Sequence, residues 1–153
     1  PLPVPAGGPV TRVDFYVLQD VDLAAAHRFA CRRAAKAVTT GNHVHIHNDD
    51  QAAAAELDEM LWHYPEHRFI PHASEDSTLA KPSPLLLGWN PPVDPDGVLI
   101  NLASEIPTFF GRFDRVAEIV VEATRDTGRE RYKFYRDRGY PLFHHELEDW
   151  EAA

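Results

Sequence analysis

The stretch VDFYVLQDVDLAAAHRFACRRAAKAVTTGNHVHIH, residues 13–47, decides the fold class of this chain. Residues 13–18 are β-branched or aromatic and predict a strand. Residues 23–38 are rich in alanine and predict a helix that packs closely on a sheet. The apolar positions that recur there at helical spacing are Leu23, Ala26, Ala30, Ala34 and Ala37. The alternation in residues 43–47 predicts a second strand, so the stretch as a whole predicts a β-α-β unit.

The rest of the chain extends this pattern, although the order of the strands is not predicted. Residues 49–62 open with two acids and predict a second helix. Short apolar segments, with Pro- and Gly-rich loops at 74–84 and 90–97 between them, lie at 68–72, 85–89 and 98–102. A short helix at 109–114, a strand at 116–122 and a last helix from 125, stopped by Gly139 and Pro141, follow. We therefore predict an α/β fold with a largely parallel sheet and helices on both faces.

Composition bounds the class of protein. The chain has 153 residues and a formal net charge of −9, and no apolar run approaches the roughly 20 residues that span a bilayer. We expect a flexible Pro- and Gly-rich lead at 1–11, a single domain at 12–149 and no membrane association. Cys31 is the only cysteine, which excludes an intrachain disulfide and fits the cytoplasm; we expect its thiol to be buried and inert.

Positive charge is concentrated near the C-terminus of this acidic chain. Residues 125–138 hold six of the fifteen Lys and Arg residues. Helical spacing places Tyr132 and four of these cations on one face, namely Arg125, Arg129, Lys133 and Arg136. Such a face could simply be solvated, but like charges at this spacing repel, so we expect an anionic ligand with an apolar part, such as a carboxylate-ended peptide. Single-stranded nucleic acid is the competing ligand, although the negative total charge argues for little direct binding.

Two further clusters are candidates for chemistry or binding. His43, His45 and His47 alternate on a predicted strand and could hold a transition metal, which would make the chain a metal-dependent hydrolase. The alternative is a scaffold strand whose histidines face a cleft or solvent. Trp62, Tyr64 and Phe69 form an aromatic cluster that is either core or a protein interface. We find no Gly-rich phosphate loop and no nucleophile elbow, so the sequence predicts neither an enzyme nor a cofactor.

Several segments together resemble the chi subunit family of bacterial DNA polymerase III holoenzyme. The last helix, RERYKFYRDRGYPL at 129–142, and LDEMLWHYPEHRFIPH at 57–72 are the most specific of them. The resemblance implies a single Rossmann-like α/β domain and a non-catalytic accessory subunit of the clamp-loader assembly. It also argues against metal binding by the three histidines, because they match no metal motif of the family.

The resemblance also implies partners and positions. Members bind the acidic, Phe-ended C-terminal tail of single-stranded DNA-binding protein, pair with the psi subunit of the clamp loader and, in some cases, contact a DNA helicase. The tail-binding positions fall on Arg129, Tyr132 and Lys133, with Val120 as a pocket wall and Arg125 as a basic position just upstream. Arg136 joins the expected site because helical spacing puts it on the same face. The positions that face psi fall on Trp62 and Phe69.

Overall fold

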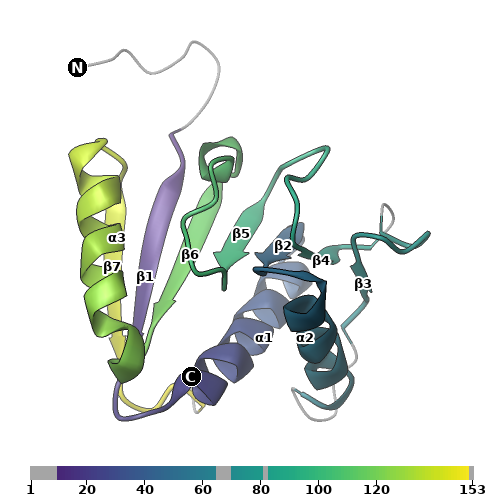
Figure 1. The fold of residues 1–153 in the computed structure, drawn as a ribbon, viewed down its shortest axis with the longest axis horizontal. Coiled ribbons are helices and arrows are strands. Elements are labelled where there is room, and N and C mark those ends of the chain that lie inside the picture. Colours follow the sequence, from purple (N-terminus) through teal and green to yellow (C-terminus); the bar gives the residue numbers. More distant parts are fainter. Residues whose placement is uncertain (1–9, 65–69, 81–82, 152–153) are drawn as a thin grey trace.

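The computed structural model describes residues 10–64, 70–80 and 83–151, and these form a seven-stranded parallel sheet of order β3-β4-β2-β5-β6-β1-β7 (Figure 1). The strands are β1 (Arg12–Leu18), β2 (Val44–His47), β3 (His72–Ser74), β4 (Leu85–Gly88), β5 (Val98–Asn101), β6 (Arg115–Val120) and β7 (Leu142–Leu147). Every adjacent pair in the sheet is parallel. The predicted α/β class is therefore confirmed. Most of the predicted lead at 1–11 lies outside the described residues.

The helices lie on both faces of the sheet, as predicted. They are α1 (Leu23–Thr39), α2 (Gln51–His63) and α3 (Arg125–Asp137), with single 3₁₀ turns η1 (Phe110–Arg112) and η2 (Glu122–Thr124). Acidic caps start the first two: an Asp22 carboxylate oxygen accepts from Ala25 N at 3.0 Å, and one of Asp50 accepts from Ala53 N at 2.8 Å. Helix α3 ends at Asp137, two residues before Gly139, which is left-handed with φ of 80°.

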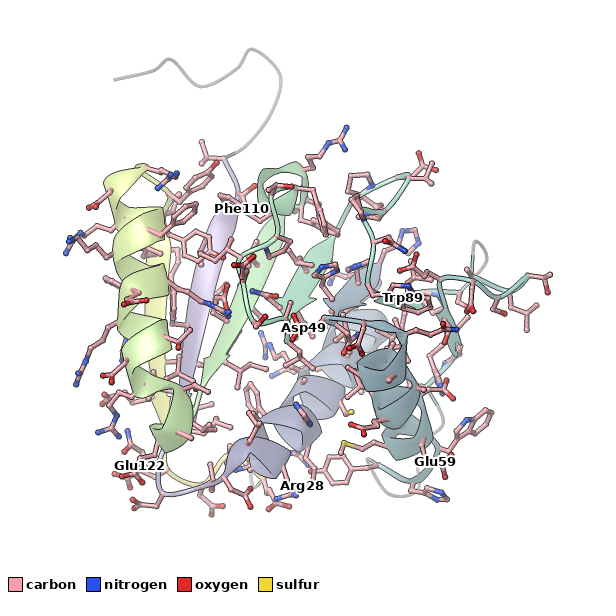
Figure 2. The ribbon with its side chains drawn as sticks, in the orientation of Figure 1. Arg28, Asp49, Glu59, Trp89, Phe110 and Glu122 are labelled. Atoms are coloured by element: carbon pink, nitrogen blue, oxygen red, sulfur yellow. The ribbon has the colours of Figure 1, made fainter. Side chains whose placement is uncertain are left out.

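The larger core lies between the sheet and helices α1 and α2. Alanines let α1 approach the strands closely, and Ala30 and Ala34 are fully buried in the same core as Ile46 of β2. The other face carries a second, aromatic core beneath α3 and η1, with Phe15 and Leu99 on its floor. Phe110 of η1 (Figure 2) packs its ring edge-on against Phe134, Tyr135 and Tyr140 at 5.0–5.9 Å. This second core places α3 over β1 and β6.

Strand β7 is the element that the sequence does not predict. The segment LFHHEL has no β-branched residue and has three exposed side chains, so local propensity gives little signal for a strand. It becomes a strand because it pairs in parallel with β1, with Val13 opposite Leu142 and Leu18 opposite Leu147. A further tie is a hydrogen bond between His145 Nε2 and a carboxylate oxygen of Asp14 at 2.9 Å.

Most of the remaining boundaries differ from the predictions by one or two residues, but β3 begins only at the last residue of the segment expected at 68–72. The loops expected at 74–84 and 90–97 flank β4 as predicted, and η1 replaces the short helix expected at 109–114. Among the helices that the structure describes, none has both the length and the apolar character needed to cross a bilayer.

Candidate functional site

A buried carboxylate fixes α3 on the sheet. Glu118 of β6 is 1% exposed, and it accepts hydrogen bonds from Arg131 Nη1 at 2.8 Å, from the Tyr135 hydroxyl at 2.7 Å and from Asn101 Nδ2 at 3.1 Å. Arg131 also donates to the backbone oxygen of Ala103 at 2.9 Å. Burial and the Glu118 carboxylate raise the pKa of Tyr135, so its hydroxyl stays protonated and donates. This network sets which side of α3 turns outward.

A second contact sets how close α3 lies to the sheet. Gly128 packs directly on Val120, and a Cβ at position 128 would lie only 2.8 Å from Val120 Cγ2. One turn further on, the half-buried ring of Tyr132 meets Phe15 of β1 edge-on, with ring centroids 5.3 Å apart. Val120 is itself 7% exposed, so it forms the floor beneath this part of the helix.

The outward side of α3 carries the cations that the sequence indicates. At about 100° per residue, the side chains of five positions project through an arc of about 100°, in the order Tyr132, Arg125, Arg136, Arg129 and Lys133. We call these five residues the α3 face. Arg129 is 72% exposed and makes only a long contact, 3.4 Å, with the exposed Asp126. Arg125 and Lys133 are exposed and make no ion pair with any described residue.

Not every cation of this stretch is available. Arg131 is 14% exposed and its charge is paired with the Glu118 carboxylate. The guanidinium of Arg138 stacks on the ring of Phe134 at 3.6 Å. Arg136 lies on the α3 face but contacts its neighbour Asp137 at 3.3 Å.

The sequence did not indicate that Glu118 and Gly128 are the residues that position this face. A charged residue inside the β-branched run of 115–120 was the available signal, since such a strand is buried on both sides.

The three histidines do not assemble as the metal alternative requires. His43 precedes β2 and its ring Nδ1 contacts the Asp96 carboxylate at 3.1 Å, whereas His45 and His47 stack on each other with Nε2 and Nδ1 3.3 Å apart. Phe109 packs edge-on against both of these rings. Within the described ranges, no group of three His, Cys, Asp or Glu side chains is placed to hold a metal ion. The geometry therefore gives the hydrolase hypothesis no support.

The buried histidine has a consequence for stability that can be measured. Burial and the nearby His47 lower the pKa of His45 from 6.5 to about 4, so the folded chain keeps this imidazole neutral while the unfolded chain protonates it. The stability contributed by His45 is complete above pH 6.5 and is lost as the pH falls from 6.5 through 4. We expect a slope of up to about 1.4 kcal/mol per pH unit from this residue. Urea unfolding at pH 7, 6 and 5 should show a shallower slope for His45→Gln than for the parent.

The exposed His63, whose side chain is 76% exposed, provides the matched control. His63→Gln should retain the parent slope. Equal slopes for the parent and His45→Gln would contradict the proposed source of the pH dependence.

The other candidate residues are also placed by the structure. Cys31 is fully buried, and burial raises the pKa of its thiol to about 12, which confirms the predicted inert cysteine. Trp62 is 57% exposed at the end of α2, with its ring edge-on to His72 at 5.2 Å, so it is a surface residue rather than core. Tyr64 is half-buried. Phe69 lies outside the described residues.

Comparison with known proteins places the chain in a family. The model of the family described as DNA polymerase III chi subunit, HolC, matches residues 10–143. The chain belongs to this family. It is 44% identical to the DNA polymerase III subunit chi of Pseudomonas aeruginosa over 140 residues, which cover 90% of this chain and 98% of that protein.

Two more distant chi subunits agree with this assignment. Identity is 32% over 132 residues with the protein of Haemophilus influenzae and 31% over 136 residues with that of Escherichia coli. In both cases the match covers 84% of this chain and 92% of the relative. The chi subunit is an accessory replication subunit of DNA polymerase III, so the resemblance noted in the sequence is confirmed at the level of the family.

Proposed function

We propose that this chi-family chain is a non-catalytic adaptor that binds the acidic C-terminal tail of single-stranded DNA-binding protein through the α3 face. A psi-type partner then links it to the clamp loader. The observation that carries this proposal is the exposure of Arg129 and Lys133 beside Tyr132, on a helix whose opposite side is anchored by Glu118. In keeping with this role, we expect a cytoplasmic protein that needs no cofactor.

The α3 face suits a carboxylate that ends on an aromatic residue. Arg129 has a guanidinium fork that can grip a carboxylate through two parallel hydrogen bonds, and Lys133 adds a mobile ammonium one turn away. Tyr132 offers a ring that is already held by Phe15, so it loses little freedom when another ring packs against it. Val120, Arg125 and Arg136 are the remaining members of the proposed site, as floor and flanking charges.

A second surface supports the link to the clamp loader. Trp62 exposes more than half of its indole at the end of α2, on the helix layer opposite to α3. Large exposed aromatic side chains are typical anchors of protein interfaces. We propose that this end of α2 faces psi, together with Phe69, and that it is the surface on which a helicase would compete in members that bind one.

Calorimetric titration with a short synthetic peptide that carries acidic residues and a C-terminal Phe tests the proposal. We expect micromolar affinity for the parent chain, since the gains from charged hydrogen bonds and ring burial are offset by ordering of the peptide. Arg129→Ala combined with Lys133→Ala should weaken binding at least about tenfold, because the loss of even one charged hydrogen bond costs about 1.5 kcal/mol. Added salt should also weaken binding.

Arg112→Ala is the matched control, because Arg112 is an exposed arginine of η1 that lies outside the α3 face. It should bind the peptide as tightly as the parent. Unchanged affinity in the Arg129 and Lys133 double variant would refute the tail-binding role of α3. Binding of a short oligonucleotide at physiological salt, in place of the peptide, would favour direct DNA binding instead.

A further inference from the structure

A second concentration of positive charge lies on the other side of the sheet. Besides the six cations of residues 125–138, six more of the fifteen come from α1 and from the starts of β1 and β6: Arg12, Arg28, Arg32, Arg33, Lys36 and Arg115. Helix α1 contains no Asp or Glu. The sheet residues of this group lie on the face that α1 covers only in part, since Arg12 and Arg115 keep 38% and 42% of their side-chain surface exposed.

A single buried carboxylate organises the centre of this surface. Asp14 is 2% exposed and accepts from Arg12 Nη2 at 3.0 Å, from Arg115 Nη2 at 3.3 Å and from His145 Nε2 at 2.9 Å. Burial alone would raise the pKa of Asp14, but the hydrogen bonds from Arg12 and His145 and the charge of Arg115 lower it below its usual value. One negative charge thus holds two guanidinium groups and an imidazole in place, and the cluster stays net positive.

Aromatic rings support the same cations. Arg33 of α1 lies over the ring of Tyr16 at 5.1 Å, and His145 stacks on that ring at 4.8 Å. Arg12 lies 3.7 Å above the ring of Phe143, which is 41% exposed. Arg33 makes no ion pair with any described residue, and Arg115 uses only one nitrogen on Asp14. We call Arg12, Arg33, Arg115, Phe143 and His145 the β7 surface, and the buried ring of Tyr16 lies beneath it.

The β7 surface and the α3 face lie on opposite faces of the sheet, on either side of the edge strand β7. Gly128 and Arg131 contact β6, and Tyr132, one step around the helix, contacts β1, the next strand toward the edge. Going further around the helix axis in the same direction, the next side chains are those of Arg136 and Arg129, which therefore project from the β7 side of α3. Figure 1 shows α3 running beside β7 and β1 at this edge. On the far side of β7, Phe143 and His145 begin the second surface.

We propose that the β7 surface binds an acidic polypeptide segment that continues from the α3 face around the edge of β7. This inference rests on the proposed function, because its occupant is the acidic stretch that precedes the aromatic end held by α3. A tail of about fifteen extended residues reaches about 50 Å, which is ample to round one strand. Arg33 and Arg115 are the residues that receive the upstream carboxylates.

Two observations favour a polypeptide over a nucleic acid strand. The geometry around Asp14 shows that Arg12, Arg115 and His145 converge on a carboxylate at hydrogen-bond distance. In the described part of the chain β7 pairs only with β1, so its outer edge offers unpaired backbone groups that an extended peptide can meet.

Two peptides of different length test the inference by fluorescence anisotropy with the full chain. The short peptide carries a few acidic residues and a C-terminal Phe; the long peptide adds about ten acid-rich residues upstream. We expect the long peptide to bind about tenfold more tightly at low salt. Arg33→Ala combined with Arg115→Gln should remove that gain and leave the affinity for the short peptide unchanged, which also shows that the variant is folded. Arg112→Ala should change neither affinity.

The possible outcomes separate this inference from the proposed function. If the short peptide binds and the long peptide gains nothing, or if the gain survives in the Arg33 and Arg115 double variant, the inference is wrong and the proposed function stands. If neither peptide binds, both fail. A long acidic peptide without the terminal Phe that binds the parent and not the double variant supports the β7 surface even if α3 binds no tail. A single-stranded dT oligonucleotide is the last probe. If it binds the parent more tightly than the long peptide does, and the Arg33 and Arg115 double variant loses that binding, the surface belongs to nucleic acid and the inference is wrong.

Discussion

Glu118→Ala is expected to lower the free energy of unfolding by about 3–5 kcal/mol, the cost of breaking a buried ion pair from one side. The substitution leaves the guanidinium of Arg131, only 14% exposed, without its carboxylate, and it removes the acceptor of the buried Tyr135 hydroxyl. The Tyr135 hydroxyl then stays buried without an acceptor, and Arg131 keeps the backbone oxygen of Ala103 but loses the carboxylate, so free energy is lost beyond that of the broken bonds. Urea unfolding monitored by circular dichroism measures this loss directly.

Glu122→Ala is the matched control, since Glu122 is an exposed glutamate in the turn just before α3 (Figure 2). It should change stability by no more than about 0.5 kcal/mol. A loss of less than about 1 kcal/mol for Glu118→Ala would show that the network does not hold α3. The Glu118 variant should also lose tail-peptide affinity, because the helix that carries Arg129 is no longer anchored.

Gly97→Ala is expected to destabilise the chain by about 3 kcal/mol or more, from two sources that can be separated. Gly97 has φ of 75°, a conformation that costs an L-residue about 1–2 kcal/mol. In addition, a Cβ at this position would lie 2.2 Å from the backbone oxygen of His43, which cannot move without disturbing the start of β2. The backbone oxygen of Gly97 also receives Asp114 N and Arg115 N, so the turn that begins both β5 and β6 depends on this residue.

Gly41→Ala isolates the conformational part of that cost. Gly41 has φ of 90° but nothing within 4 Å of an added Cβ. It should therefore lose only about 1–2 kcal/mol in the same urea experiment. Equal losses for the two variants would show that the close contact with His43 relaxes at no cost.

The sequence predicts the framework well because its signals there are local. The strand-helix-strand start and the capped α2 follow from residue types within a few positions of one another. Strand β7 could not be predicted this way, because Leu142–Leu147 is extended only by virtue of its pairing with β1. The order of the strands has the same origin, since parallel pairing joins segments that are distant in the chain.

The sequence predicted which residue types make up the candidate site, but not which side of α3 faces outward. The cations of 125–138 are evident in the sequence, yet the choice of Arg129 and Lys133 over Arg131 as exposed groups depends on how α3 is rotated against the sheet. Glu118 and Gly128 set that rotation through contacts between β6 and α3. Whether Arg129, Tyr132 and Lys133 bind a tail stays a prediction, as does the role of Trp62.

The position of β1 also determines when during synthesis the protein can finish folding. The first strand of the chain lies between the last two, β6 and β7, and its Asp14 bonds to a histidine 131 residues away. A nascent chain on the ribosome therefore keeps this apolar strand without either neighbour until β6 has been synthesised. Contacts between such distant residues form slowly. We expect β1 to be the segment that chaperones shield in the unfinished polypeptide, and the α3 face to form only once that strand is enclosed.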